Sequence, residues 1–389
     1  MSIPILIVGL ILFIGLIIVH EFGHFIVARR NGVEAEEFGI FFPPRLFRHR
    51  TKRGWLFSIN LLPLGGFVKL KGEHDTDVAP GSFGAASLWA KTKIMAAGVM
   101  MNLVVGMFLL AIIAWIGLPQ LIPGQYNVKY ASHISHQEVL ITAVEPNSPA
   151  ATIDLKPENQ LIAVGVPGQL KPVNTVAELQ HQTKISAGKN TEIVYKSNGV
   201  EHIKFVKLQS DAVVNASLKT KQPKGYLGVV PTELTLRQYN WWGGIVESVG
   251  LTVQIIKLTF IGLGHALSGL GEMIAGLVTG NTVARQHGQK VASSQVAGPV
   301  GIFVILKDGS LLGYQYMLFI IAVISLTLAI MNILPIPALD GGRLWLTLGS
   351  RAIGMPLSAS IEEVVNAIGM MILLTLIALV TLVDVHRFF

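Results

Sequence analysis

Four long apolar stretches constrain the fold of this chain more than any other feature. A helix needs roughly 20 residues to cross about 30 Å of hydrocarbon. The stretches are long enough for this, and they cover about residues 3–28 and 94–118, the run from Asp308 to Asp340, and the run from Glu363 to Asp384. Only 14% of the residues are charged, whereas an average soluble domain carries about 25%. The sequence therefore predicts a polytopic α-helical membrane protein with about four transmembrane helices.

Charge and cysteine usage narrow the possible functions. The chain has no cysteine, which excludes disulfides, thiolate metal ligands and cysteine nucleophiles. Any metal site must therefore use histidine and carboxylate side chains. The net charge is +7, which in a membrane protein is typical of an excess of lysine and arginine in cytoplasmic loops. We expect the lipid bilayer, and no nucleic acid, as a partner of the chain.

The apolar stretches divide the chain into four predicted regions. These are an N-terminal membrane domain, an extracytoplasmic α/β domain, an interfacial amphipathic segment and a C-terminal membrane domain, at residues 1–123, 124–239, 240–310 and 311–389. The loop between the first two spans is rich in lysine and arginine, which predicts a cytoplasmic position. In this loop Trp55–Leu61 and Gly66–Leu70 are predicted strands, joined by residues 62–65 into a membrane-associated β-hairpin.

The first apolar stretch carries the motif His20-Glu21-Phe22-Gly23-His24. Residues at i and i+4 share one face of a helix, so both imidazoles can reach a single Zn²⁺. Glu21 lies beside them as a potential general base for water. Ionisable side chains are costly inside a spanning helix. Their clustering therefore favours a catalytic function over a chance position near the interface.

A third metal ligand is predicted near the end of the third stretch. Catalytic zinc sites usually have three protein ligands and one open position. Pro335 and Pro337 break the helix just before Asp340, and such breaks are tolerated where the backbone lines a buried cavity. Asp340 is therefore the expected third ligand. The alternative interpretation is an aspartate at a helix end, followed by a glycine turn.

The pairing of His20 and His24 with Leu339-Asp340-Gly341 resembles the site-2 protease family of intramembrane zinc metalloproteases. The arrangement is most similar to the bacterial branch, the regulator-of-sigma-E proteases. The resemblance extends over nearly the whole chain and includes residues 62–69, Gly98-x-x-x-Asn102 and residues 298–301. It implies a multi-pass protein of the bacterial inner membrane that holds one Zn²⁺ per chain and cleaves transmembrane segments in regulated intramembrane proteolysis.

The resemblance also implies which residues bind substrate. Asn332, Gly65 and Gly66 would hold the substrate in an extended form, and Asn102 would contribute near the active site. An interhelical hydrogen bond is an equally good interpretation of Asn102. The implied substrates are single-pass membrane proteins already trimmed by another protease, of the anti-sigma-factor or signal-peptide-remnant type.

The region between the second and third membrane segments resembles a single PDZ domain. Residues 144–151 match the family's turn into its first helix. The sequence departs from the pattern at Ile153-Asp154, where Ala-Gly is typical, and at Glu158-Asn159, where Gly-Asp is typical. Two interpretations therefore stay open for this domain, a peptide-binding module and a filter of substrate size.

Two other classes of function fit parts of the sequence. A catalytically silent membrane scaffold could bind partners through a PDZ-like domain, but it would not need His20, Glu21, His24 and Asp340 together. A transporter with intramembrane ligands is disfavoured because the chain lacks inverted-repeat hydropathy and because Glu21 lies between the ligands.

The order of the spans predicts the topology. The loop after the first span is cytoplasmic, so the second span returns the chain to the outside. Asp340 must reach the depth of His20 and His24, so the third span must also begin outside. Residues 245–280 are therefore predicted to lie along the outer interface, or to dip and return, and not to cross once.

Overall fold

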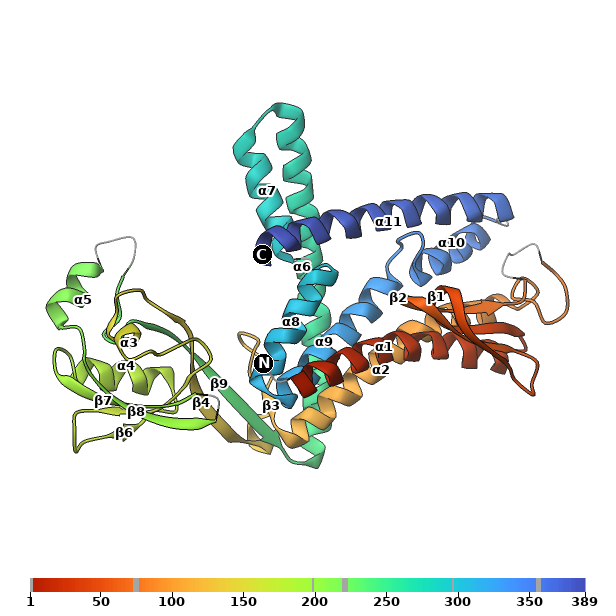
Figure 1. The fold of residues 1–389 in the computed structure, drawn as a ribbon. Helices are drawn as coiled ribbons and strands as arrows, with labels where there is room; N and C mark the ends of the chain where they lie inside the picture. The colour runs from red at the N-terminus through yellow and green to blue at the C-terminus, as the bar shows by residue number, and fades with distance from the viewer. Residues whose placement is uncertain are drawn as a thin grey trace. The chain divides into compact units, whose positions relative to one another are not determined.

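The computed structural model describes residues 3–72, 77–197, 199–218, 223–295, 297–354 and 358–388. The chain forms two compact units. One unit combines residues 1–113 with 245–389, and the other consists of residues 114–244. Figure 1 shows the helices and strands of both units.

The first unit holds long apolar helices. Among the described residues, five helices are long and apolar enough to cross a membrane: α1 (Ile3–Arg30), α2 (Leu88–Ile116), α6 (Trp241–Thr279), α9 (Tyr314–Ile333) and α11 (Ala359–Phe388). The helices α7 (Thr282–Gln295) and α8 (Pro299–Leu312) form a bent pair that would qualify together as a sixth span. Length and composition therefore support a membrane protein, as the sequence predicts.

Small residues allow α1 and α2 to approach each other. A β-carbon added to Gly23 would lie only 2.7 Å from the carbonyl oxygen of Ala97, so the two backbones pass in close contact. The C-terminal part of α1 also contributes Ala28 to a buried cluster with residues of α2 and the neighbouring sheet, including Ile94 and Leu70. This packing places the His20–His24 motif of α1 next to α2.

The segment predicted to be interfacial is one long helix. α6 has 39 residues, and Lys257 and Glu272 are exposed on it without interrupting it. A β-carbon on Gly269 would lie 2.7 Å from the backbone nitrogen of Ala292, so α7 packs tightly against α6 as a helical hairpin. Figure 1 shows α7 beside the distal part of α6.

The strands in the loop after α1 pair differently from the sequence prediction. β1 (Ala35–Arg50) and β2 (Leu56–Leu70) form an antiparallel sheet with several register shifts. Residues 37–40 pair with 66–69 on one side and with 56–59 on the other. The prediction that Trp55–Leu61 and Gly66–Leu70 pair with each other was wrong, because residues 37–40 lie between them and take the ladder bonds of both. Within the described residues, 66–70 form an edge of this sheet.

Buried polar side chains hold the bent sheet together. Glu37 is buried and accepts hydrogen bonds from Ser58 Oγ at 2.6 Å and from Arg45 Nη2 at 2.6 Å. The Nδ2 of buried Asn60 donates to the carbonyl oxygens of Ile40 and Phe41 at 3.2 and 3.0 Å. These bonds satisfy groups that would otherwise be costly to bury.

The chain turns sharply between α9 and α10 (Asp340–Ala352), as the two prolines predict. α9 ends at Ile333 and α10 begins at Asp340, which confirms the helix break. β-Carbons on Gly341 and Gly342 would overlap the backbone carbonyls of Leu334 and Ile336. Only glycine therefore permits the start of α10 to pack on this turn.

The C-terminal helix is joined to the start of α8. The carboxylate of buried Asp384 on α11 accepts hydrogen bonds from the backbone nitrogens of Gly298 at 2.9 Å and Gly301 at 2.8 Å. These are donors of the first turn of α8, which have no partner within their own helix. The carboxylate also has a favourable interaction with the positive end of the helix dipole.

The second unit is a twisted antiparallel sheet with short helices. Its strand order in the described residues is β3-β9-β4-β5-β7-β8, with β6 paired to β5. The strands are β3 (Leu118–Pro119), β4 (Ser132–Val144), β5 (Gln160–Gly165), β6 (Lys171–Pro172), β7 (Asn190–Ser197), β8 (Val200–Lys207) and β9 (Val229–Tyr239). The helices are η1 (Lys129–Ala131), α3 (Pro149–Thr152), α4 (Val176–Ile185) and α5 (Asp211–Ser217). Its core includes Val139, Leu161, Leu179 and Ile193.

Candidate metal centre and active site

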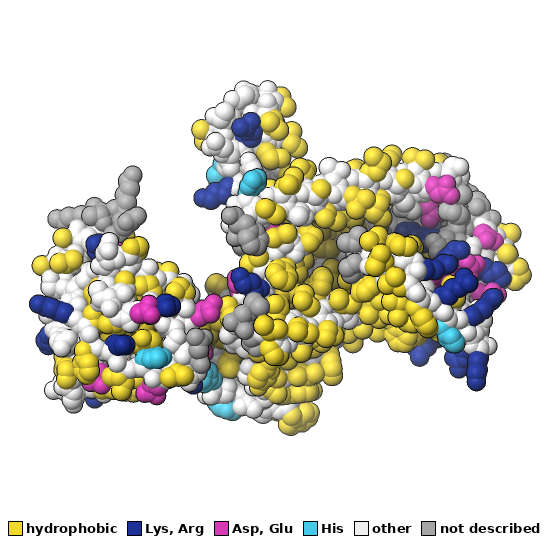
Figure 2. Space-filling model, in the orientation of Figure 1, with side chains coloured by type: hydrophobic (Ala, Val, Ile, Leu, Met, Phe, Trp, Pro, Cys, Tyr) yellow, Lys and Arg dark blue, Asp and Glu magenta, His cyan; other side chains and the backbone are white. Residues whose placement is uncertain are grey.

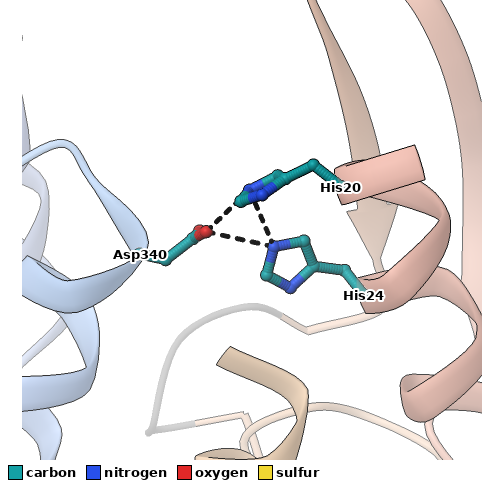
Figure 3. Close-up of side chains that lie close together, drawn as sticks. All are labelled: His20, His24 and Asp340. Carbon is teal, nitrogen blue, oxygen red and sulfur yellow. Dashed lines mark hydrogen bonds and ion pairs between the residues drawn. The ribbon is translucent and has the colours of Figure 1, made fainter. Parts of the chain in front are cut away.

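Three side chains from distant parts of the chain converge at one point. His20 and His24 are one turn apart on α1, and Asp340 is the first residue of α10 (Figure 3). The Oδ2 of Asp340 lies 2.9 Å from His20 Nε2 and 3.1 Å from His24 Nε2. The two Nε2 atoms are 3.3 Å apart. Among the described residues, this is the one group of three or more histidines and acidic residues able to hold a metal ion.

The spacing of these three atoms fits a zinc ion. Ligand atoms about 2.0–2.2 Å from Zn²⁺ at tetrahedral angles lie roughly 3.3–3.6 Å from one another. The observed separations of 2.9–3.3 Å are within a few tenths of an ångström of that range. Two imidazoles and one carboxylate are also a donor set used by catalytic zinc sites, which leave the fourth position open.

The second ring nitrogen of His24 determines which atom faces the metal position. His24 Nδ1 donates a hydrogen bond to the carbonyl oxygen of Ile94 at 2.8 Å. A carbonyl oxygen only accepts, so Nδ1 must carry the proton, and the lone pair of Nε2 is left for a metal. This is the arrangement expected of an imidazole ligand that is oriented by its other nitrogen.

His20 is contacted in a similar way by Asn102 on α2. The amide of Asn102 lies 3.3 Å from His20 Nδ1, and the Oδ1 of the same amide is buried without a hydrogen-bond partner. Oxygen and nitrogen of an amide exchange places on rotation by half a turn. In the rotated form Oδ1 accepts from Nδ1–H, and the lone pair of His20 Nε2 faces the metal position.

Gly98 on α2 makes room for the two imidazoles. A β-carbon at this position would overlap His24 Nε2 and would lie 2.6 Å from His20 Nε2. The α2 backbone therefore forms one wall of the site, at a position where any side chain would displace a ligand. Asn102 follows one turn later, and its backbone carbonyl oxygen accepts a hydrogen bond from Ser325 Oγ of α9 at 2.7 Å.

The Oδ2 of Asp340 faces the Nε2 atoms of both imidazoles. An ionised carboxylate is the form that ligates a metal ion.

Glu21 lines a small cavity beside the three potential ligands. The cavity has a volume of about 120 Å³, and its lining includes Glu21, His24, Val68, Asp340 and Arg343. This volume is enough for a few water molecules, since each takes about 30 Å³ in the liquid. A general base and water can therefore be accommodated next to the metal position.

The edge of the β1–β2 sheet borders the same cavity. A β-carbon on Gly66 would lie 3.1 Å from Glu21 Cγ and 3.3 Å from the carbonyl oxygen of Gly39. Gly65, also predicted to bind substrate, packs against the ring of Phe42. Asn332 is the penultimate residue of α9 and is partly buried, eight positions before Asp340.

Arg343 is a cavity residue that the sequence analysis missed. It lies one turn after Asp340, which is the signal that could have revealed it. Its Nε donates to Glu362 at 3.1 Å, and its guanidinium lies 4.7 Å from the centre of the Phe83 ring. Arg343 thus joins α10, α11 and the segment before α2 at the rim of the cavity.

Comparisons with known proteins agree with this geometry. The model of peptidase family M50 matches residues 8–376. A protein of Clostridium perfringens named as a zinc metalloprotease is 29% identical over 98% of both chains. The protease eep of Enterococcus faecalis is 26% identical, with 96% of this chain and 97% of that protein covered. The regulator of sigma-E protease of Salmonella typhimurium is 26% identical over 96% of both chains.

The long apolar helices and the His-His-Asp cluster define a membrane metalloprotease. The chain belongs to peptidase family M50, the site-2 proteases. The sequence prediction of this family is thereby confirmed, and so is the prediction of an enzyme of the metalloprotease class.

Proposed function

We propose that this protein is an intramembrane endopeptidase that cleaves transmembrane segments of single-pass membrane proteins. His20, His24 and Asp340 hold one Zn²⁺, and Glu21 is the catalytic acid and base. The observation that carries the proposal is the convergence of two Nε2 atoms and one carboxylate oxygen, 2.9–3.3 Å apart, beside Glu21.

The reaction assigns a separate task to each group. A bound zinc ion supplies Lewis-acid polarisation of the scissile carbonyl and of water. Glu21 accepts a proton from the attacking water and passes it to the leaving amine. His24, held by Ile94, and His20, held by Asn102, keep their Nε2 atoms directed at one point. Asn102 is buried against a ligand, so we propose that it positions His20 and does not contact the peptide.

Substrate is proposed to bind along the sheet edge formed by residues 66–70. A helical substrate must unwind before cleavage, because its carbonyls are hydrogen-bonded within its own helix. The edge of a sheet can offer replacement bonds by β-augmentation. Gly66 lets an added strand pass close to Glu21, and Gly65 and Asn332 are proposed to border the same path.

Residues 124–239 are proposed to be a PDZ-like domain on the extracytoplasmic side. Support comes from a cavity of about 360 Å³ between α4 and residues 224–231, which a peptide could enter. Leu179 and Thr183 of α4 line one wall, and Tyr226 and Gly228 line the other. We propose that this domain selects substrates, either through this cavity or by excluding large ectodomains.

The topology is proposed to have four transmembrane helices, namely α1, α2, α9 and α11. Residues 1–123 and 311–389 form the two membrane domains, and residues 240–310 stay at the outer interface. In this topology α9 must cross the membrane in the same direction as α1. If α6 also crossed the membrane, the α7–α8 pair would have to bring the chain back to the outer side before α9 begins. The bacterial inner membrane is the proposed location.

Substrates trimmed beforehand by another protease are the proposed class. The relatives named as a regulator of sigma-E protease support anti-sigma factors, and remnants of signal peptides are a second candidate of the same kind.

The position of the cut tests this proposal. Purified protein in proteoliposomes is incubated with a single-pass substrate, and the products are identified by mass spectrometry. We expect a cut inside the apolar segment, loss of cutting after chelation, and recovery when zinc is returned. Cleavage confined to the polar flanks would contradict intramembrane proteolysis. A catalytically silent scaffold would give no products under any of these conditions.

A further inference from the structure

A second cavity lies at the C-terminal end of α1 and is lined by arginines. Its volume is about 690 Å³, and Arg29, Arg50, Arg53 and Trp55 contribute to its walls. Figure 2 shows lysine and arginine side chains gathered over the region of β1 and β2. The cavity is separate from the one that contains Glu21, because the two have no lining residue in common.

The two carboxylates at this cavity are neutralised by lysines. Glu36 pairs with Lys69 at 2.9 Å, and Glu34 pairs with Lys71 at 3.1 Å. In contrast, the three arginines form no ion pair with any carboxylate in the described part of the chain. The cavity therefore carries an excess of positive charge that its own residues do not balance.

Two of the arginines, Arg50 and Arg53, lie at the end of β1 and in the turn that follows it. Arg50 Nε donates to the carbonyl oxygen of Gly54 at 3.2 Å, and the backbone nitrogen of Thr51 donates to the carbonyl oxygen of Trp55 at 2.9 Å. The Trp55 ring lies 4.8 Å from the ring of Phe25 on α1. This contact connects the turn to the helix, so that Arg50 and Arg53 face the end of α1.

We propose that this cavity binds the phosphate group of an anionic phospholipid. Guanidinium groups are suited to phosphate because they donate several parallel hydrogen bonds. The position of the cavity indicates that the phosphate belongs to a lipid. The apolar run of α1 ends at Ala28 beside Arg29, so the cavity lies where this helix leaves the hydrocarbon. Tryptophan and basic residues are typical of that level of a membrane.

Native mass spectrometry of the full-length protein in a non-ionic detergent tests the proposal. Retention of phosphatidylglycerol is compared with retention of phosphatidylcholine, with and without inorganic phosphate. The site variant is Arg50→Gln with Arg53→Gln. The matched control is Arg48→Gln with Lys52→Gln, which removes the same charge from the same strand and turn without touching the cavity lining.

We expect the wild type and the control pair to retain phosphatidylglycerol in preference to phosphatidylcholine. The site pair should retain about tenfold less phosphatidylglycerol, because it loses charge-assisted hydrogen bonds to the phosphate. The control pair loses the same charge but keeps these hydrogen bonds. Equal losses in both pairs would show a diffuse surface potential and overturn the site. Binding of inorganic phosphate without any preference for the lipid would overturn the lipid assignment. Zinc content and proteolysis in detergent should match the wild type in both pairs, which separates this test from that of the peptidase.

Discussion

The Oδ2 of Asp340 lies 2.9 Å from Nε2 of His20, although the two residues are at opposite ends of the chain. This contact brings the start of α10 to the first helix and completes the group of three potential metal ligands. Gly341 and Gly342, which follow Asp340, allow the start of α10 to pack on the turn that comes after α9.

Gly98→Ala should remove zinc and activity. A β-carbon at position 98 would overlap His24 Nε2, and His24 cannot retreat without losing its hydrogen bond to Ile94. We expect zinc content to fall well below one ion per chain, as measured by atomic absorption on purified protein.

Gly15→Ala on α1 is the control for that change. A β-carbon at Gly15 has no other atom within 4 Å, and alanine is the better helix former. This variant should keep full zinc and activity. If Gly98→Ala behaved like Gly15→Ala, the close approach of α2 to the ligands would be refuted.

Asn102→Leu should weaken zinc binding by about 10- to 100-fold, the usual cost of losing a partner of a ligand histidine. Leucine has a similar size but cannot accept a hydrogen bond from His20 Nδ1–H. Asn102→Asp keeps an acceptor and should retain zinc affinity near that of the wild type. Zinc affinity is measured by competition with a chromophoric chelator.

The aspartate variant distinguishes the two orientations of the amide. An aspartate has no N–H group, so it can only accept. If Asn102→Asp lost zinc as severely as Asn102→Leu, the oxygen would not be the atom that faces His20, and the positioning role would fail.

Gly66→Val should slow cleavage of a transmembrane substrate and leave zinc in place. The added side chain would occupy space beside Glu21, 3.1 Å from its Cγ, on the edge where substrate is proposed to pair. Turnover at the wild-type rate with normal zinc content would argue against strand pairing at this edge.

Much of the candidate site could be predicted because helical periodicity is local. His20 and His24 are four residues apart, and this spacing alone places both imidazoles on one face of a helix. Pro335 and Pro337 predict the end of α9, and the structure confirms this break. The meeting of Asp340 with α1 is a tertiary contact, and its prediction rests on the ligand number of zinc and on the helix break at Pro335 and Pro337.

The strand order of the sheet could not be predicted in the same way. Local pattern identifies Trp55–Leu61 and Gly66–Leu70 as extended, but not their partners. Residues 37–40 lie between them, and buried Glu37 accepts hydrogen bonds from Ser58 and Arg45 in this position. The contact between Asn102 and His20 likewise depends on how α1 and α2 cross, which no local signal in either helix determines.

The proposed topology predicts where introduced cysteines react. The chain has no native cysteine, so single cysteines at Val230 and Asn281 can be labelled cleanly. Both should react with an impermeant thiol reagent from the outside of right-side-out vesicles. If the position at Asn281 reacted only from the cytoplasmic side, α6 would cross the membrane, and the four-helix arrangement would be wrong.

His20, His24 and Asp340 are proposed to hold a catalytic zinc ion, and Glu21 is proposed to move the proton. The most direct test measures zinc content and cleavage on the same preparations of the wild type, Glu21→Gln and Asp340→Ala. We expect one zinc ion per chain in the wild type and in Glu21→Gln, cleavage in the wild type alone, and loss of both zinc and cleavage in Asp340→Ala. Normal zinc and cleavage in Asp340→Ala, or undiminished cleavage in Glu21→Gln, would contradict the account.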